Sequence, residues 1–195
     1  MKQKNPSTRG QRPGFGRQGA EHHPGTTVKR SKKTATVARV APGAAPKADP
    51  NSIIRPVRAG DLEQIIAIDT QITGIGKADY WHERIRRYSG RGRQQRFFLV
   101  AEHGRDIQGF IIGEVRDWEF GTPPCGWVFG ISVRPEARLS GIGTQLLDTL
   151  CDSFHQAGMV KVRTLLVFDD LLVMAFYRSH GMMAAPIITL ERDLG

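Results

Sequence analysis

The sequence predicts a single domain of the α/β class that runs from about residue 53 to residue 195. It should be built on one mixed sheet, with the antiparallel strands first, as in an α+β fold. Three observations support this fold class. The composition changes sharply near Pro50, and beyond it apolar runs of strand length are interspersed with helical patterns. Near Trp127 the pattern changes from successive strands to strand, helix, strand, helix, which is typical of a parallel pair joined by a crossover helix.

The first fifty residues carry the whole net charge. Residues 1–49 contain eleven Lys or Arg against Glu21 and Asp49, a balance of +9 that equals the formal net charge of the 195-residue chain. They contain no apolar run, and their one aromatic residue is Phe15. Such a segment cannot bury enough surface to offset chain entropy. We therefore predict a disordered basic extension over residues 1–50 and an electrically neutral domain after it.

The first half of the domain predicts strands and two helices. We expect a strand over 53–58, a helix capped by Asp61, a second helix over 79–88, and a loop at 91–93. Two apolar runs, 97–102 and 107–118, flank the turn residues 103–106 and predict an antiparallel hairpin.

The second half predicts a βαβ unit and a closing pair of elements. A strand over 127–133 leads to a helix over 141–156, whose apolar positions share one face. The nearly continuous apolar run 160–168 predicts a strand that is covered on both faces. A last helix capped by Asp169 or Asp170 should run to His180, and 187–191 should form a closing strand.

Several classes of protein are not indicated. We find no apolar segment long enough for a secretory signal or a membrane helix, so no membrane association is expected. The two cysteines, Cys125 and Cys151, are too few for a disulfide framework or a zinc site, and the six histidines form no ligand pattern. We expect a cytoplasmic protein without a bound metal.

The segment between the strand at 127–133 and the following helix has the chemistry of an anion-binding loop. Free backbone N–H groups and the positive end of the helix dipole meet there. Glycines at positions 141 and 143 permit positive φ angles and close approach of a ligand. A Gly-x-Gly at a strand–helix junction also fits an ordinary tight turn without a ligand. The surrounding sequence pattern is therefore needed to distinguish an anion-binding loop from such a turn.

That larger pattern resembles a known family. The stretches ISVRPEARLSGIGTQLLDTL and VRTLLVFDDLLVMAFYRSHGM look like the core of the GNAT N-acetyltransferase superfamily: a strand ending in Val-x-Pro, an Arg/Gln-x-x-Gly-x-Gly/Ala loop, a helix, a strand, and a helix with an aromatic pair before Gly. The resemblance extends over about residues 53–194 and implies a GNAT-like acyl-CoA N-acyltransferase fold. Asp170 and Met182 depart from it, because the family often has Asn and Phe there.

The resemblance implies how acetyl-CoA, the co-substrate, would be held. The coenzyme pyrophosphate would meet the backbone amides of the loop formed by Arg138, Leu139, Ser140, Gly141, Ile142, Gly143 and Thr144. The pantetheine arm would bond to a splayed strand edge at Ile131, Ser132 and Val133. The same backbone donors could stabilise the oxyanion formed when an amine attacks the thioester.

Two residues are candidates for proton transfer. Tyr177 is the expected general acid, because a phenol with a pKa near 10 can protonate the departing thiolate at neutral pH; packing as a core aromatic is the alternative. The family often uses a Glu on a central strand as the base, and 127–133 contains none. Glu119 and Asp117, expected on one face of the preceding strand near its end, are the carboxylates that could replace it, and Glu119 is the candidate base; a solvated position in the hairpin is the alternative for both.

The expected function is therefore acetyl transfer from acetyl-CoA to a primary amine of a protein or a small molecule. A non-catalytic acyl-CoA-binding regulator is an alternative, because the strand glutamate is missing. A nucleic-acid-associated protein is another, since the basic extension is typical of arms that contact nucleic acid or ribosomes by counterion release. A solubilising extension fits the same composition. The sequence determines neither the acceptor nor the oligomeric state.

Overall fold

The computed structural model describes residues 52–89 and 95–194, all within the compact unit Gly43–Gly195. The predicted disordered extension and the predicted loop at 91–93 lie outside the described residues. Within them, five strands form one sheet in the order β1-β2-β3-β4-β5. Neighbouring strands are antiparallel except β4 and β5, which are parallel, so the predicted mixed α/β sheet is confirmed.

The order of elements follows the prediction as far as the last helix. The strands are β1 (Ser52–Pro56), β2 (Arg96–His103), β3 (Asp106–Arg116), β4 (Cys125–Val133) and β5 (Val162–Thr164). The α-helices are α1 (Leu62–Thr73), α2 (Ala78–Ser89), α3 (Ile142–Gln156) and α4 (Leu171–Ser179). Three short 3₁₀ turns are η1 (Ala59–Asp61), η2 (Glu119–Gly121) and η3 (Pro135–Ala137).

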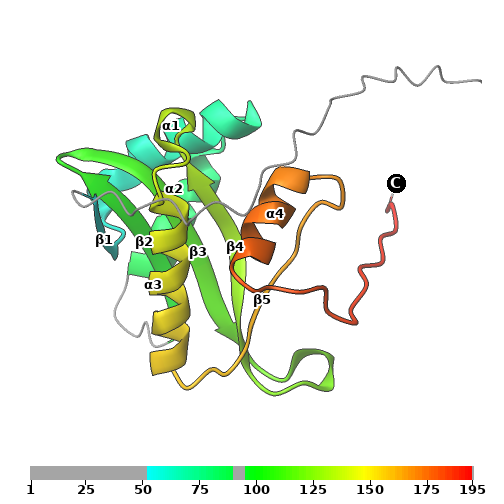
Figure 1. Ribbon diagram of the computed structural model, residues 1–195. Coiled ribbons are helices and arrows are strands. Elements are labelled where there is room, and N and C mark those ends of the chain that lie inside the picture. The colour runs from blue at the N-terminus through cyan, green and yellow to red at the C-terminus, as the bar shows by residue number, and fades with distance from the viewer. Residues whose placement is uncertain (1–51, 90–94, 195) are drawn as a thin grey trace, which may run out of the picture. The chain divides into compact units, whose positions relative to one another are not determined.

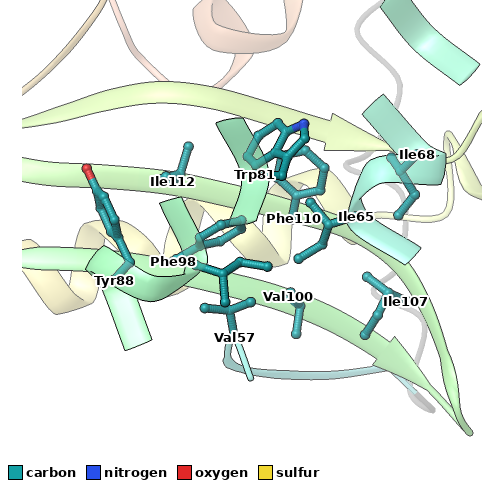
Figure 2. Close-up of a cluster of buried hydrophobic side chains, with 11 residues drawn as sticks. Val57, Ile65, Ile68, Trp81, Tyr88, Phe98, Val100, Ile107, Phe110 and Ile112 are labelled. Carbon is teal, nitrogen blue, oxygen red and sulfur yellow. The ribbon is translucent and has the colours of Figure 1, made fainter. Parts of the chain in front are cut away.

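Helices cover both faces of the sheet (Figure 1). On one face α1 and α2 bury a cluster centred on Trp81, Phe98 and Phe110, whose rings pack edge-on or tilted (Figure 2). On the other face α3 packs through Leu146 and Leu150. Residues that alternate along β3 therefore serve two separate cores, because successive side chains of a strand point to opposite faces.

Asp61 precedes α1 as predicted, but its side chain does not cap that helix. Its carboxylate accepts hydrogen bonds from the backbone N–H of Arg58 at 2.7 Å and from both Nη atoms of Arg55 at 2.8 Å. The Arg55 Nε also donates to Glu102 on β2. Asp61 therefore anchors the chain between β1 and α1 to the sheet.

Three predicted strands have different bounds or are absent. The strand expected over 107–118 ends at Arg116, and the one expected over 160–168 is reduced to Val162–Thr164. Of its remaining apolar residues, Leu166 is half-buried against the α3-face cluster, whereas Val160, Leu165, Val167 and Phe168 are exposed, Phe168 by 89%. No strand forms over 187–191 in the described part of the chain, where Leu190 is 89% exposed. Residues 165–168 and 187–191 are apolar enough for a strand but have no strand partner in the described part of the chain.

Candidate functional site

The β4–β5 pair separates partway along β4. The two strands pair only from Gly126 with Val162 to Val128 with Thr164. At the same point the ladder between β3 and β4 changes register: Val128 pairs with Gly113 and Gly130 with Ile112, so Phe129 is an extra residue. Such bulges bend a strand and are frequent beside functional sites. Beyond Val128, β4 therefore has no ladder partner on its β5 side within the described residues.

The open edge carries the three strand residues predicted to hold a pantetheine arm. Arg134 donates its backbone N–H to Gln108 of β3 at 2.8 Å. Because backbone groups alternate in direction along an antiparallel ladder, Ser132 also faces β3 while Ile131 and Val133 face the opening. Two of the three residues thus direct N–H and C=O groups into the gap.

The predicted anion-binding loop directly follows this edge. Leu139 and Gly141 both have positive φ, 63° and 83°, and Gly141 is the N-terminal cap residue of α3 without a side-chain cap bond. The first N–H groups of α3 have no acceptor within the helix. Ser140 Oγ instead donates back to the Ala137 carbonyl at 2.6 Å, which tightens the turn. The loop therefore presents backbone donors at a helix N-terminus, as an anionic ligand requires.

The two glycines in the loop differ in role. Gly141 adopts a left-handed conformation that favours glycine. At Gly143 an added Cβ would lie 3.3 Å from Cε2 of Phe176 on α4. Gly143 therefore lets α4 pack closely against the first turn of α3. Arg138, the exposed first residue of the loop, provides a positive charge there.

Tyr177 lies near the point where the strands separate. It is 4% exposed, in the same cluster as the buried residues of α3. Burial raises its pKa, and a hydrogen bond with the Thr164 side chain acts in the opposite direction. Thr164 Oγ1 donates in turn to the carbonyl oxygen of Val128, the last β4 residue paired with β5. The phenol is thus placed at the mouth of the opening and stays protonated at neutral pH.

Helix α4 begins as predicted and is tied to the loop by a contact that the sequence did not predict. Asp170 Oδ1 accepts from the Val173 backbone N–H at 3.0 Å, a standard N-terminal cap. At the other end, His180 Nε2 lies 3.0 Å from Thr144 Oγ1, and its Nδ1 lies 2.8 Å from the Phe176 carbonyl oxygen. A proton on Nδ1 satisfies that carbonyl and leaves Nε2 to accept from Thr144. The helix that carries Tyr177 and the loop are therefore fixed to each other.

Glu119 lies on η2, not on the strand where its position was predicted. Its Oε2 is 3.4 Å from Nη1 of Arg116, and its backbone carbonyl accepts from Thr122. The turn follows Arg116, which pairs with Cys125 at the start of β4. Glu119 thus belongs to the end of β4 that is opposite to the loop. Asp117 is exposed just before the turn.

A second carboxylate near the opening was missed by the sequence analysis. Glu114 on β3 is the cross-strand partner of Trp127 and accepts a hydrogen bond from the Tyr88 hydroxyl at 2.8 Å. Its Oε1 lies 3.6 Å from Nε of Arg116. A charged residue inside the apolar run Ile107–Val115 was the signal available in the sequence, since charges are rarely buried without partners.

A shallow hollow on the surface of the described residues adjoins the loop. This hollow, of about 300 Å³, is lined by Glu136, Ala137, Ser140 and Ile142, among others. A larger one of about 460 Å³ lies at the far end of α3, beside Phe97 and Gln156. The first touches the predicted coenzyme loop through Ser140 and Ile142 and is otherwise lined by residues of η3 and the β2–β3 hairpin, whereas the second has no relation to the chemistry described above.

The described residues contain neither a metal-binding cluster nor a membrane-spanning helix. Over residues 52–89 and 95–194, no three His, Cys, Asp or Glu side chains are grouped so that they could hold a metal ion. No helix in the same part of the chain is long and apolar enough to cross a membrane.

Comparisons with known proteins agree with this architecture. The model of the "Acetyltransferase (GNAT) family" matches residues 62–182. No curated protein matches the sequence. Among solved structures, the aminoglycoside N-acetyltransferase AAC(6')-Iy in complex with CoA superposes with a TM-score of 0.66 and 16% identity, over 80% of this chain and 100% of that one.

Two further solved structures have the same fold. Aminoglycoside 6'-N-acetyltransferase AAC(6')-IG from Acinetobacter haemolyticus has a TM-score of 0.62 and 18% identity, over 73% of this chain and 99% of that one. A transcriptional regulator from Bacillus halodurans C-125 has a TM-score of 0.63 and 18% identity, over the same shares of the two chains. At these identities the likenesses establish the fold and leave the substrate open.

Proposed function

This chain belongs to the acetyltransferase (GNAT) family, and from that premise we propose that it transfers an acetyl group from acetyl-CoA to a primary amine of a protein or small molecule. One observation carries the proposal: the opening between β4 and β5 leads along a free strand edge into the positive-φ loop at the start of α3. An extended chain of amides that ends in a pyrophosphate matches this succession of an edge and an anion site.

In this proposal the coenzyme lies along β4. Its pyrophosphate accepts hydrogen bonds from backbone amides between Arg138 and Thr144, with the Arg138 charge beside it. Its pantetheine amides bond to the outward-facing backbone groups of Ile131 and to the N–H of Val133, whose carbonyl oxygen accepts from Arg138 Nε at 3.4 Å. The related fold of AAC(6')-Iy is in complex with CoA, which supports coenzyme binding by this architecture.

The thioester then lies near Val128 and Phe129, where the strands part. Backbone N–H groups of β4 stabilise the oxyanion formed as the amine attacks the carbonyl carbon. Tyr177 gives its proton to the departing thiolate, since its buried phenol is protonated at neutral pH. The acceptor ammonium must first lose a proton, and the two carboxylates beside Arg116 are the candidates: Glu119, expected from the sequence, and Glu114.

Transfer of radiolabelled acetyl groups tests the proposal. Purified protein is incubated with labelled acetyl-CoA and three classes of amine: spermidine, the aminoglycoside sisomicin and a lysine-containing peptide. We expect labelled product with at least one of them, and its loss in Tyr177→Phe. Binding of acetyl-CoA without transfer to any amine would instead support the non-catalytic regulator.

A further inference from the structure

A charged and aromatic cluster lies on the face of the sheet covered by α1 and α2, beside the opening between β4 and β5. Glu114 is 17% exposed at its side chain and accepts from Tyr88 of α2 at 2.8 Å. Arg116, two residues along β3, lies on the same face. Its guanidinium sits over the rings of Trp127 and Phe129, at 5.4 and 4.9 Å from their centroids. The proposed function leaves Glu114 of this cluster and Glu119 as alternatives for the base.

The position of Glu114 along the sheet distinguishes it from Glu119. Glu114 pairs with Trp127, one residue before Val128, where pairing with β5 ends. Arg116 pairs with Cys125, three residues before Val128, and the turn that carries Glu119 lies beyond it. With a rise of about 3.3 Å per residue, the backbone of Glu114 is displaced by about 3 Å from Val128 along the strand, and that of Glu119 by more than about 10 Å.

The two faces of the sheet place an acid and a carboxylate on opposite sides of the opening. Tyr177 belongs to the cluster on the α3 face, and Tyr88, the partner of Glu114, belongs to the cluster on the other face. An amine that approaches from the α2 face meets Glu114 and the half-exposed ring of Phe129, which is 42% exposed. The thiolate leaves toward the side of Tyr177.

We propose that Glu114 is the residue that takes the proton from the acceptor amine, and that Tyr88 is a positioning residue for its carboxylate. This inference rests on the proposed function and names a residue for its unassigned step. Glu114 is anchored to a helix by Tyr88, whereas Glu119 is held by Arg116 on a short surface turn.

Acetyl transfer moves two protons from the acceptor nitrogen and exchanges a C–S bond for a C–N bond. The ammonium gives one proton to the Glu114 carboxylate and becomes a neutral amine. Its lone pair forms the C–N bond, and the C–S bond breaks as the tetrahedral intermediate collapses. The thiolate takes the Tyr177 proton. The nitrogen releases its second proton to water, from which the phenolate is protonated again, and Glu114 returns its own proton to water.

Several charged and hydrogen-bonding groups surround Glu114. Burial, together with the hydrogen bond and the charge of Glu114, raises the pKa of Tyr88 to about 12, so Tyr88 remains a donor throughout the working range. The other charged side chains near the cluster are Arg84 and Arg87 on α2, Arg116 on β3, Glu119 on η2 and Arg163 on β5.

The test compares Glu114→Gln with the wild type, using whichever of spermidine, sisomicin and the lysine-containing peptide is acetylated fastest. The glutamine keeps an oxygen that can accept from Tyr88, so the fold is retained while the basic group is lost. We expect kcat/KM for the amine to fall by about 100-fold or more, with acetyl-CoA affinity changed less than about twofold. The rate of the variant should keep rising with pH as free amine becomes available.

Matched variants separate this role from a structural one. Glu63→Gln, on the exposed side of α1, should leave activity unchanged. Tyr88→Phe should lower kcat several-fold with little change in KM for the amine. The inference is overturned if Glu114→Gln behaves like Glu63→Gln, or if Glu119→Gln alone abolishes transfer.

Two remaining outcomes are also decisive. If Glu114→Gln does not fold, a folded Tyr88→Phe with unchanged kcat and pH profile overturns the inference. If the wild type binds acetyl-CoA but acetylates none of the three amines, the proposed function fails and this inference fails with it. A failure of the inference alone leaves wild-type transfer intact.

Discussion

At the residue scale, two buried polar side chains connect the chemistry to the fold. Tyr177 is surrounded by apolar residues of α3 and the sheet, yet its hydroxyl reaches Thr164 where β4 and β5 part. Asp61 is 6% exposed and accepts three hydrogen bonds from Arg55 and Arg58. Tyr177→Phe tests the first residue by removing the hydroxyl while keeping the ring, and Asp61→Ala tests the second by removing the carboxylate that accepts these bonds.

Tyr177→Phe should lower kcat by about 100-fold while leaving acetyl-CoA affinity within about twofold, because it removes a proton donor and keeps the ring that packs in the core. Steady-state release of coenzyme thiol, paired with calorimetric binding, separates the two effects. Unchanged kcat in a folded variant would assign Tyr177 to the core alone.

Asp61→Ala should destabilise the protein by about 1–3 kcal/mol at pH 7, because it leaves the Arg58 N–H and Nη2 of Arg55 without their acceptor. Burial by itself would raise the pKa of Asp61, but the bonds from Arg55 and Arg58 outweigh it and lower that pKa. The contribution is therefore present above the unfolded-state pKa of about 4 and disappears as pH falls through the lower folded-state value.

Urea unfolding at pH 7 and at pH 3 measures this difference, with Glu63→Ala on exposed α1 as the control. The gap between wild type and Asp61→Ala should narrow at the lower pH. A gap of equal size at both pH values would show that the carboxylate charge is not what stabilises the fold.

At the element scale, β4 shapes the site because it has no side chain at Gly126 and no β5 partner after Val128. Glycine at position 126 leaves room for the Phe154 ring of α3, and the absence of a β5 partner after Val128 opens the edge. The same strand is therefore closely packed over its first half and open over its second.

Gly126→Ala should destabilise the protein by about 1–3 kcal/mol, because its Cβ would lie 2.5 Å from Cδ2 of the buried Phe154 ring. Gly130→Ala on the same strand is the control: its nearest neighbour, Ile112 Cγ2, would be 3.8 Å away, so its effect should stay below about 1 kcal/mol. Denaturant midpoints of the two variants provide the comparison, and equal midpoints would refute the packing account.

Much of the element order could be predicted from periodicity, while the extent of the strands could not. Helical spacing and the glycine loop located α3 and its N-terminus within a residue. The run 160–168 was predicted as one buried strand, although only Val162–Thr164 pairs and Leu165 and Phe168 are exposed. An apolar run indicates that a segment tends to be buried, but whether another strand or helix packs over it depends on the tertiary fold, which local sequence does not determine.

The site divides in the same way. The loop and Tyr177 were identified from local chemistry and a family pattern, and their roles remain predictions. Glu114 was not identified, because its significance depends on Trp127 across the ladder and on Tyr88 from a helix 26 residues earlier. Sequence spacing shows which residues share an element, whereas contacts between elements require the register.

At the scale of the whole molecule, charge separates the chain into two parts. The domain from Pro50 is neutral by composition, and the net charge of +9 resides in the first 49 residues. Nucleic-acid contact, if it occurs, should therefore depend on that segment and not on the acetyltransferase fold.

Deleting residues 1–50 should leave acetyl transfer unchanged and abolish salt-dependent binding to single-stranded RNA, because counterion release scales with the number of basic residues engaged. Fluorescence anisotropy with a labelled oligonucleotide at two salt concentrations measures the effect. Equal RNA affinity with and without the segment would show that it has no such role.

The most direct test of the central claim is calorimetric titration of acetyl-CoA into the wild type, Gly141→Glu, Arg138→Glu and Gly158→Glu. Gly158 is the matched control, since it has the same φ of 83° at the other end of α3 and open space around its Cβ. We predict a dissociation constant in the micromolar to millimolar range for the wild type and Gly158→Glu. Binding should be lost in Gly141→Glu and weakened in Arg138→Glu. The absence of binding to folded wild type, or equal affinity in Gly141→Glu, would contradict the account.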